Sequence, residues 1–372
     1  MGDCQDKQEK AVLIKLLFKA PFCQLFRGIG IPQILPFALT VNVTDRCNSK
    51  CKLCKIYRKN TLELNLGEFE KIFSNFKGDV FWLTITGGEP FLRKDLVEIC
   101  KSAYKNFHPM MMNIPTNGIS YEVIAQNAER ILNECPKTRI TINLSLDHFA
   151  ERHDEMRGVK DNFRFAMETF KRLRSINHPN LTLGINTVLS KYNIKDFLVF
   201  SKKLMELKPD TYIAEIAQER VELGNAGLDM HPDLRDYLEA ISYFRKNIIS
   251  TDYRGIAKII QSFRLRYYEL IIKMLKERRQ VISCYAGFSS AYISSEGEVW
   301  ACCVKAKSMG NLRDNNYNFR KIWFGKKAEN VRAGIKDRKC FCTAAGVNYI
   351  NMLYDIKSLL NSGLNFLRFS LR

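Results

Sequence analysis

Between Phe37 and Asp229 the sequence alternates between short apolar segments, which favour buried strands, and longer amphipathic segments, which favour helices. Repeated strand–helix units predict a parallel sheet with helical crossovers. The predicted strands are 38–43, 80–85, 109–114, 139–146, 182–188 and 211–216, and the predicted helices are 66–77, 94–106, 120–134, 161–176 and 194–207. A doubly wound open sheet and an incomplete (β/α) barrel both fit this pattern, and both bind ligands at the carboxyl ends of their strands.

Three cysteines follow the first predicted strand on one short segment, Cys47, Cys51 and Cys54, in the spacing C-x3-C-x2-C. Three thiolates on one loop can hold three irons of a cubane [4Fe–4S] cluster, which leaves the fourth iron without a protein ligand. An open metal position is where a substrate or cofactor binds, so this array indicates chemistry. A zinc site that lacks its fourth ligand is the alternative interpretation.

This array resembles that of the radical S-adenosylmethionine (SAM) superfamily, with Leu53 at the hydrophobic position before the third cysteine. The segment Thr86-Gly87-Gly88-Glu89-Pro90 follows the second predicted strand and is similar to the GGEP motif of that family. The two motifs also come in the order and at the distance usual for the family. The resemblance implies an α/β fold, a partial (β/α)6 TIM-like barrel followed by a small C-terminal domain.

The resemblance implies further contacts with SAM at the predicted strand ends. Residues 115–118 are similar to the TNG segment of the family, although a plain turn fits them equally. Residues 143–147 resemble an SLD segment, and residues 153–158 resemble an HDxxRG segment. The cofactor-binding residues implied in this way are Leu53, Tyr57, Gly87, Gly88, Glu89, Pro90, Thr116, Asn117, Ser145, Arg157 and Asn186.

Individual roles follow from side-chain chemistry within this resemblance. The glycines are expected to let the backbone approach a ligand, and Glu89 to receive an ammonium group. A guanidinium suits a carboxylate, so Arg157 is expected to pair with that of SAM. Ser145 is expected to contact the ribose, and Asn186 the ribose or the carboxylate. Asp147 is expected to shape the pocket, and His153 to be a structural turn residue.

A second group of cysteines lies near the C-terminus: Cys284, Cys302, Cys303, Cys340 and Cys342. Residues 290–301, around the turn 295–298, are predicted to form a β-hairpin. This pattern resembles the SPASM or twitch domains that hold auxiliary [4Fe–4S] clusters, although a full SPASM pattern has seven cysteines. The resemblance implies one auxiliary cluster, and a structural zinc site is the alternative. Its predicted ligands are Cys284, Cys302, Cys340 and Cys342, with the spacing favouring Cys302 over Cys303.

The other cysteines and the charge add general constraints. The chain has 12 cysteines among 372 residues, clustered in a way that favours metal sites over disulfides and so a reducing compartment. Cys4, Cys23, Cys100 and Cys135 fit no array, and the last two are expected in helical core. The net charge is +19. Most of it falls between Arg254 and Lys339, which indicates an acidic partner, an anionic membrane or a solvated face.

Five regions are predicted along the chain. They are an amphipathic N-terminal extension at 1–36, a radical SAM core at 37–230, a helical linker at 231–280, a cluster domain at 281–345 and an amphipathic tail at 346–372. A helix predicted at 8–27, which Pro21 should kink, could pack under the barrel or rest on a membrane. The tail could likewise cover the barrel or lie on a membrane. No segment reaches the length of a transmembrane helix.

Together these features predict a radical SAM iron–sulfur enzyme. The family chemistry cleaves SAM reductively to a 5′-deoxyadenosyl radical, which abstracts hydrogen from an unactivated position of a peptide or protein substrate. A lipid or other membrane-associated substrate is the alternative, and a metal-stabilised nucleic-acid-binding protein is the alternative of another class. Nucleic acid is otherwise not an expected partner. The expected electron donor is a protein such as flavodoxin or ferredoxin, and the expected location is cytoplasmic, with or without contact at the inner membrane surface.

Overall fold

The computed structural model describes residues 19–371, apart from 252, 254, 255 and 339. Six strands alternate with helices along the first two thirds of the chain. The strands are β1 (Ala38–Thr44), β2 (Trp82–Gly87), β3 (Met111–Thr116), β4 (Arg139–Ser145), β5 (Leu181–Leu189) and β6 (Thr211–Ile216). All six predicted strands are therefore confirmed, with β2 and β3 beginning two residues later than predicted.

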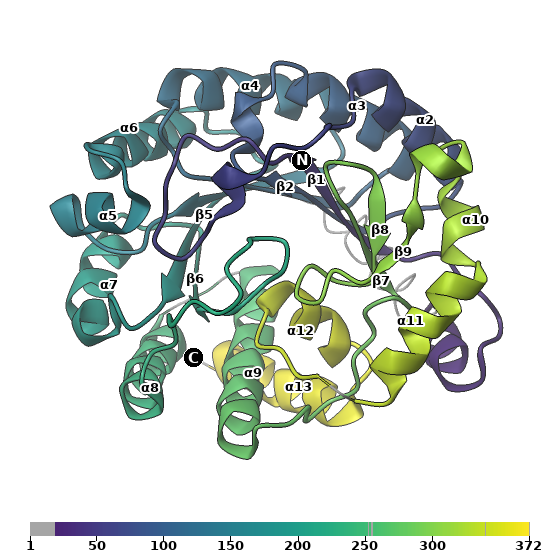
Figure 1. Ribbon diagram of the computed structural model, residues 1–372. Coiled ribbons are helices and arrows are strands. Elements are labelled where there is room, and N and C mark those ends of the chain that lie inside the picture. The colour runs from purple at the N-terminus through teal and green to yellow at the C-terminus, as the bar shows by residue number, and fades with distance from the viewer. Residues whose placement is uncertain (1–18, 252, 254–255, 339, 372) are drawn as a thin grey trace.

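The helices of this region cover the outside of the sheet (Figure 1). They are α2 (Leu66–Phe76), α3 (Leu96–Phe107), α4 (Tyr121–Glu134), α5 (Ala150–Arg157), α6 (Asn162–Ser175) and α7 (Phe197–Glu206). The five predicted helices are present, whereas α5 was not predicted. It is short, has no apolar stripe, and is the helix that contains His153 and Arg157.

The order of the strands decides between the two predicted architectures. The described strands form one sheet in the order β6-β5-β4-β3-β2-β1-β7-β8-β9, and neighbours from β6 to β7 are parallel. A doubly wound sheet reverses its strand order at a switch point, whereas this one runs in strict sequence from β1 to β6. Right-handed crossovers then place every helix on the same face, as in a partial (β/α)6 barrel.

The C-terminal hairpin joins this sheet. It consists of β7 (Ser290–Ile293) and β8 (Glu298–Trp300), followed by the antiparallel strand β9 (Ser308–Asn311). β7 pairs in parallel with β1, from Ala38 opposite Ser290 to Val41 opposite Ile293. The predicted hairpin is confirmed, and its first strand lies beside the strand that leads into the first cysteine array.

Two long helices, α8 (Leu234–Ser250) and α9 (Ile256–Glu277), lie where the linker was predicted. α9 covers the free edge of β6 with polar side chains. The Arg264 guanidinium donates to the carbonyl oxygen of Tyr212 (2.6 Å), and the backbone N–H of Ala214 donates to the Tyr268 hydroxyl (3.1 Å). Because an open strand edge invites pairing with other chains, these bonds protect the barrel on the side where it does not close.

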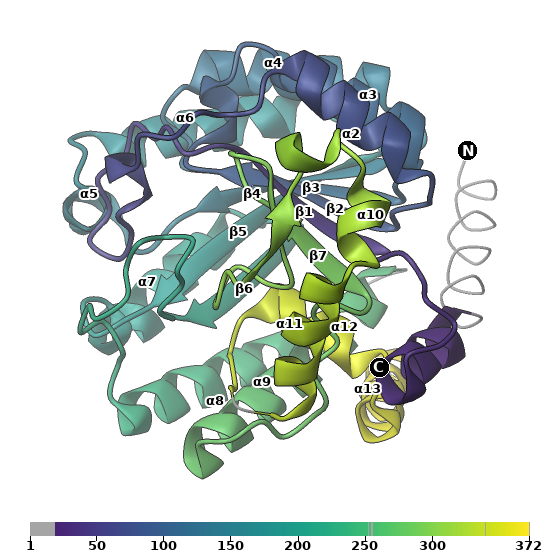
Figure 2. The ribbon, with the colours of Figure 1, turned by 45° about the vertical axis from the view of Figure 1, so that its right-hand side comes forward.

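The remaining helices complete the C-terminal part of the molecule. They are α10 (Phe319–Trp323), α11 (Lys326–Lys336), α12 (Ala345–Met352) and α13 (Ile356–Ser370). Residues 19–29 are also helical, and this segment lies beside α13 (Figure 2). The predicted helix at 8–27 therefore continues past Pro21, while its residues 8–18 lie outside the described residues. Among the described residues no helix is both long and apolar enough to cross a membrane.

Arg313 joins the C-terminal part to the barrel helix α2. Its guanidinium forms a bidentate pair with Glu68 (2.7 and 3.1 Å) and donates to the carbonyl oxygens of Leu62 and Glu63. This hydrogen bond from Arg313 is the main reason that the pKa of Glu68 is lowered from 4.5 to about 2. The stabilisation is therefore complete above pH 4.5 and is lost as the pH falls toward 2.

Replacing Arg313 with alanine is expected to lower the free energy of unfolding by about 2 kcal/mol, because a charge-assisted pair is lost and a nearly buried carboxylate remains unpaired. Chemical denaturation at neutral pH measures this. The control is Lys326→Ala, which breaks an exposed ion pair with Glu329 and is expected to cost less than about 0.5 kcal/mol. Equal losses in the two variants would contradict the prediction.

Candidate active site

The loop after β1, here called the cluster loop (residues 45–59), carries Cys47, Cys51 and Cys54. Backbone N–H groups two residues further on point at two of the sulfurs, Ser49 at Cys47 and Ile56 at Cys54, both at 3.4 Å. Burial raises the pKa of Cys47 to about 11 and of Cys54 to about 12, and the neighbouring thiols add to both shifts. The three thiols therefore lie within electrostatic range of one another, and a positively charged metal centre would be needed to ionise Cys47 and Cys54.

Glycines at three positions let other backbone segments pack against the cluster loop. A Cβ at Gly87 would lie 2.2 Å from the carbonyl oxygen of Thr44, and one at Gly88 would lie 2.2 Å from that of Arg46. Gly158 ends α5 at φ +63°, and its Cβ would lie 2.5 Å from the carbonyl oxygen of Lys50. The observed close approach of Gly87 and Gly88 is therefore to the end of β1 and the start of the cluster loop, and the predicted approach to a ligand stays a prediction.

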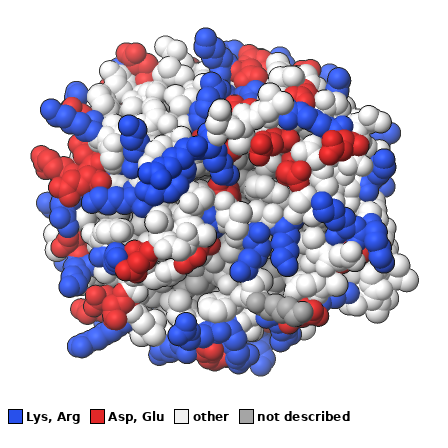
Figure 3. Space-filling model, in the orientation of Figure 1, with Lys and Arg blue, Asp and Glu red and all other residues white. Residues whose placement is uncertain are grey.

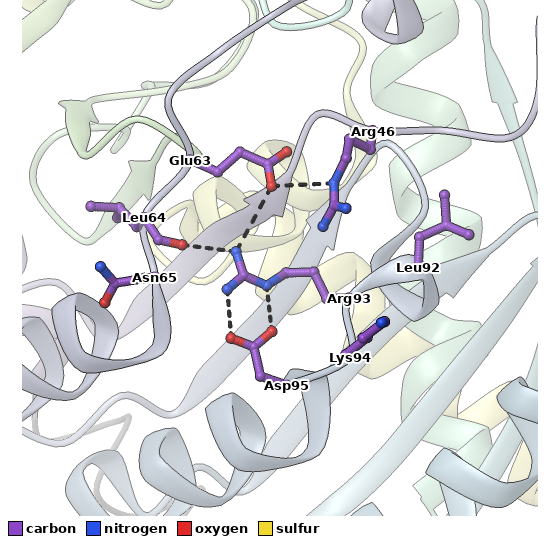
Figure 4. A pocket seen from close by; sticks show the side chains of 8 residues that line it. All are labelled: Arg46, Glu63, Leu64, Asn65, Leu92, Arg93, Lys94 and Asp95. Atoms are coloured by element: carbon purple, nitrogen blue, oxygen red, sulfur yellow. Dashed lines mark hydrogen bonds and ion pairs between the residues drawn. The ribbon is translucent and has the colours of Figure 1, made fainter.

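Polar side chains hold the entrance of the cluster loop (Figure 4). The buried Arg93 forms a bidentate pair with Asp95 and donates to the carbonyl oxygens of Val43 (2.7 Å) and Leu64 (2.8 Å). Glu63 accepts from the hydroxyl of Thr44 (2.6 Å) and from the backbone of Asp45 (2.9 Å). The charged side chains that line the pocket in Figure 4 are, apart from Lys94, consequently paired with one another, which indicates a support for the loop.

Asp45 connects the same loop to the C-terminal hairpin. Its carboxylate accepts from Asn42 (2.7 Å) and from the hydroxyl of Ser295 in the β7–β8 turn (2.9 Å). Sequence reasoning assigned no function to Asp45, since its partner is 250 residues away in the chain. The contact makes the position of the cluster loop depend on the C-terminal hairpin.

Glu89 lies at the end of β2 with only 1% of its surface exposed. Its carboxylate accepts from the backbone of Asn117 (2.7 Å), the hydroxyl of Thr116 (3.0 Å) and the backbone of Phe91 (3.1 Å). Burial raises its pKa to about 7 despite these bonds. Thr116 and Asn117 therefore do more than form a turn: they bind the carboxylate, and the Asn117 amide also donates to Asn48 in the cluster loop (2.7 Å).

Arg157 lies at the end of α5 beside the cluster loop. Its Nη2 forms an ion pair with Asp147 at 2.8 Å, its Nη1 donates to the sulfur of Cys51 at 3.7 Å, and its buried Nε has no protein partner. The predicted pairing with a carboxylate of SAM is untested and would have to use the guanidinium edge that Asp147 leaves open. His153 is fully buried in α5, a helix and not the expected turn, and accepts through Nδ1 from the backbone of Asp147 (3.2 Å).

Ser145 and Asn186 lie opposite each other in the register of β4 and β5, both at the carboxyl edge of the sheet. The Oδ1 of Asn186 is buried without a protein partner, as is the Oε1 of Gln218 just after β6. Buried polar atoms are normally paired, so unpaired ones at a strand-end edge indicate a ligand that supplies the partners. Of the other predicted contacts, Leu53 packs with Met156, Tyr57 lies in a short helical turn within the cluster loop, and Pro90 begins a short helical turn after β2.

The second group of cysteines comes together from three segments. The pKa of Cys284 is raised to about 12, chiefly by burial, with Cys302 and Cys340 as further causes. Burial and the thiols of Cys284, Cys302 and Cys340 likewise raise the pKa of Cys342. Cys302, Cys284 and Cys342 each receive a hydrogen bond from the backbone N–H two residues further on, as Cys47 and Cys54 do. Cys284, Cys302 and Cys342 thus share the environment of the first array, and Cys340 lies within electrostatic range of all three.

Cys303 has different neighbours. Its pKa is raised by burial first and then by Glu222, while Arg220 lowers it. Glu222 is buried and accepts a hydrogen bond of 2.6 Å from the hydroxyl of Tyr292 on β7. Cys303 therefore lies beside the polar loop that follows β6, although Cys302 and Cys342 also raise its pKa.

This loop after β6 connects the two cysteine sites. The backbone N–H of Lys55 in the cluster loop donates to the carbonyl oxygen of Leu223 (2.8 Å), and that of Val221 donates to Val304 beside the second group (3.2 Å). Asn225 adds a bond from its amide to the carbonyl oxygen of Leu53 (2.8 Å). At the end of β6, Glu215 has a structural role, since its carboxylate accepts from the backbone of Ala345 (3.2 Å).

Among the described residues, no three His, Cys, Asp or Glu side chains converge on the position of a single metal ion. A cubane cluster binds its thiolates through separate irons, so cysteines that serve it need not converge on one point. The remaining described cysteines are elsewhere: Cys100 and Cys135 are buried in or beside α3 and α4, as predicted, and Cys23 is buried in the helix at 19–29. Cys4 lies outside the described residues.

A partial parallel barrel with three thiols on the loop after its first strand, and more thiols in an appended hairpin domain, defines the class of iron–sulfur enzymes that use SAM. Residues 41–204 match the family model of the radical SAM superfamily, and residues 284–344 match that of the SPASM iron–sulfur cluster-binding domain. The chain belongs to the radical SAM superfamily and carries a SPASM domain. It is an enzyme, and its cofactors are [4Fe–4S] clusters and SAM.

Particular relatives support this assignment. The antilisterial bacteriocin subtilosin biosynthesis protein AlbA of Bacillus subtilis is 25% identical, covering 87% of this chain and 69% of AlbA. A probable GTP 3′,8-cyclase of Saccharolobus islandicus is 27% identical, covering 86% of this chain and 96% of the cyclase. The crystal structure of Streptococcus suis SuiB bound to its precursor peptide SuiA aligns with a TM-score of 0.55 at 18% identity, over 84% of this chain and 69% of SuiB, which shows a shared fold.

Proposed function

We propose that this enzyme modifies a peptide or protein by abstracting a hydrogen atom from an unactivated carbon. The observation that carries the proposal is the relation to AlbA, a bacteriocin biosynthesis protein, which spans both the barrel and the SPASM domain. SuiB, whose structure contains a precursor peptide, shares the fold. The GTP cyclase relative makes a nucleotide the main competing substrate, and a non-catalytic nucleic-acid binder is not supported for a member of an enzyme family.

The cluster and SAM would supply the radical that starts the reaction, and the protein would bind, orient and exclude water. The proposed cluster ligands are Cys47, Cys51 and Cys54, and Arg157 would place positive charge beside the Cys51 sulfur. Glu89 would accept the ammonium group of SAM, and Ser145 and Asn186 would bind its ribose. The loop after β6 would present Gln218 and Glu222 to the substrate between the two cysteine sites.

The electron donor is proposed to be an acidic protein such as flavodoxin or ferredoxin. Figure 3 shows a band of lysine and arginine side chains on the face that carries the cluster loop. Exposed cations on that loop include Arg46, Lys50, Lys52 and Arg58. Such a band attracts an acidic partner to the loop that holds the proposed cluster. The eleven described cysteines are all free thiols, which fits the proposed action in a reducing compartment.

The test uses enzyme reconstituted under anaerobic conditions, SAM, a reductant and short peptides encoded beside its gene. The expected result is formation of 5′-deoxyadenosine that depends on one peptide, with loss of hydrogen from that peptide by mass spectrometry. Deuterium placed in the peptide should appear in the 5′-deoxyadenosine. The proposal would be overturned if cleavage of SAM did not depend on any peptide and were stimulated by GTP or by a lipid extract.

Replacing Glu89 with glutamine is expected to weaken SAM binding roughly 30-fold, because an amide cannot pair with an ammonium group as a carboxylate does. Because the pKa of Glu89 is raised to about 7, its charged form dominates only above that pH. The affinity of the wild-type enzyme for SAM should therefore be higher above that pH than below it, and the variant should not show this pH dependence. Calorimetric titration measures both, with Glu98→Gln, at an exposed ion pair on α3, as the control. A variant that keeps the pH dependence would exclude Glu89 as its source.

A further inference from the structure

The exposed apolar side chains of the molecule gather at one place. Of the 18 large hydrophobic residues that are exposed in the described part of the chain, 11 lie on residues 19–31 and on α13 with its C-cap. These two segments lie side by side (Figure 2), and Gln24 donates to the carbonyl oxygen of Tyr354. The residues are Phe22, Leu25, Ile29, Ile31, Ile356, Leu359, Leu360, Leu364, Phe366, Leu367 and Leu371, here called the terminal apolar face.

The helix α13 is packed with its polar side inward. Its buried side chains are Ser358, Ser362 and Phe369, and Ser358 accepts a hydrogen bond from Arg266 of α9. Ile356, Leu360 and Leu364 lie one turn apart on the opposite side and are 65–70% exposed. A helix that only covers the barrel would bury its leucines. Exposing them in a row costs solubility and marks a surface that is covered by something else.

The helix at 19–29 repeats this arrangement. Cys23 and Phe26 are buried against Tyr285 and Tyr354, whereas Phe22, Leu25 and Ile29 face outward. The inward contacts hold the helix in place, since Arg27 also donates to the carbonyl oxygen of Cys284 at 2.9 Å. The outward side chains therefore belong to a fixed surface that adjoins the second cysteine site.

The charges on the two segments of the terminal apolar face are mostly positive. Residues 19–31 and 355–371 contain four cations, Lys19, Arg27, Lys357 and Arg368, and a single acid, Asp355. The Asp355 carboxylate is used to cap α13, where it accepts from the backbone and the hydroxyl of Ser358. Lys19, Lys357 and Arg368 are exposed at the margins of the apolar side chains.

We infer that the terminal apolar face docks the enzyme on an anionic lipid surface. Two amphipathic helices with leucines and phenylalanines in the middle and exposed cations at the rim match the boundary between acyl chains and acidic headgroups. The face binds in the plane of the surface, because no described helix is long and apolar enough to cross it. The inference is independent of the peptide or other substrate of the active site.

The test is flotation of the full chain with vesicles of phosphatidylcholine alone or with about one third phosphatidylglycerol. The expected result is binding to the acidic vesicles that weakens with salt. Leu360→Gln, Leu364→Gln and Leu367→Gln together should weaken binding roughly tenfold or more, because less apolar surface enters the lipid. Lys357→Gln with Arg368→Gln should weaken binding to acidic vesicles by a similar factor.

The matched control is Val199→Gln on α7, which replaces an equally exposed apolar residue of a distant helix and should change nothing. All exchanged side chains are exposed, so unchanged circular dichroism is expected and confirms folding. Absence of binding to both kinds of vesicle would overturn the inference. So would a dimer, found by light scattering, that the triple variant abolishes, because a second copy of the chain would then be what covers the face.

Discussion

Cys51→Ser is expected to abolish SAM cleavage, by roughly a thousandfold or more, while leaving the chain folded. The serine removes one of the three proposed ligands of the SAM-binding cluster and the sulfur that receives the Arg157 hydrogen bond. Iron should fall from about eight to about four atoms per chain, since a cubane cluster contains four and the second site is separate. Because burial raises the pKa of Cys47 to about 11 and that of Cys54 to about 12, these two remaining thiols should stay protonated when no cluster is bound.

Iron analysis and 5′-deoxyadenosine formation after anaerobic reconstitution measure these effects. Cys135→Ala is the control, because this cysteine is buried beside Cys100, outside both groups, and its iron content should equal that of the wild type. An active Cys51→Ser enzyme with full iron would remove Cys51 from the cluster. Loss of iron from both sites together would show that the two sites fold as one unit, through the loop after β6.

The barrel could be predicted from the sequence because its signal is local and repeated. Each strand carries its own run of apolar residues, such as those of β4, and each crossover helix its own amphipathic pattern. The choice between barrel and doubly wound sheet could not be made in this way, since it depends on which strands pair. That information lies in contacts such as β1 with β7, which are far apart in the sequence.

The candidate site was predictable where a motif carries the chemistry, as in Cys47, Cys51, Cys54 and Glu89. The supports of that site were not, because a carboxylate such as Asp45 has an ordinary neighbourhood in the sequence and gains its role from Ser295. Helix α5 was missed because its residues show no helical apolar stripe, and it is ordered by hydrogen bonds that backbone N–H groups of the cluster loop donate to the carbonyl oxygens of its last two residues. The periodicity of α13 predicted an apolar side correctly but carried no information about which way that side faces.

The variants Cys302→Ser and Cys303→Ser are expected to show that only the first of these two adjacent cysteines is a cluster ligand. Cys302 is surrounded by the other three cysteines of the second group and by backbone N–H groups of Val304 and Lys305, which suits a thiolate bound to iron. Cys303 is buried against Glu222 and Arg220 in the loop after β6. Iron in Cys302→Ser should therefore fall to about half of the wild-type amount, whereas Cys303→Ser should retain all of it.

The same two variants also show whether the second site holds iron or zinc. If the four cysteines hold an iron–sulfur cluster, Cys302→Ser should lose equal amounts of iron and sulfide. The visible absorbance of that cluster should be lost as well, and the zinc content should not change. If Cys303→Ser loses the iron instead, the ligand is Cys303 and the loop after β6 must move, which would break the bond between Glu222 and the backbone of Cys303. With Cys302 as the ligand, Cys303 remains a free thiol between the two clusters, facing the polar residues proposed to meet the substrate.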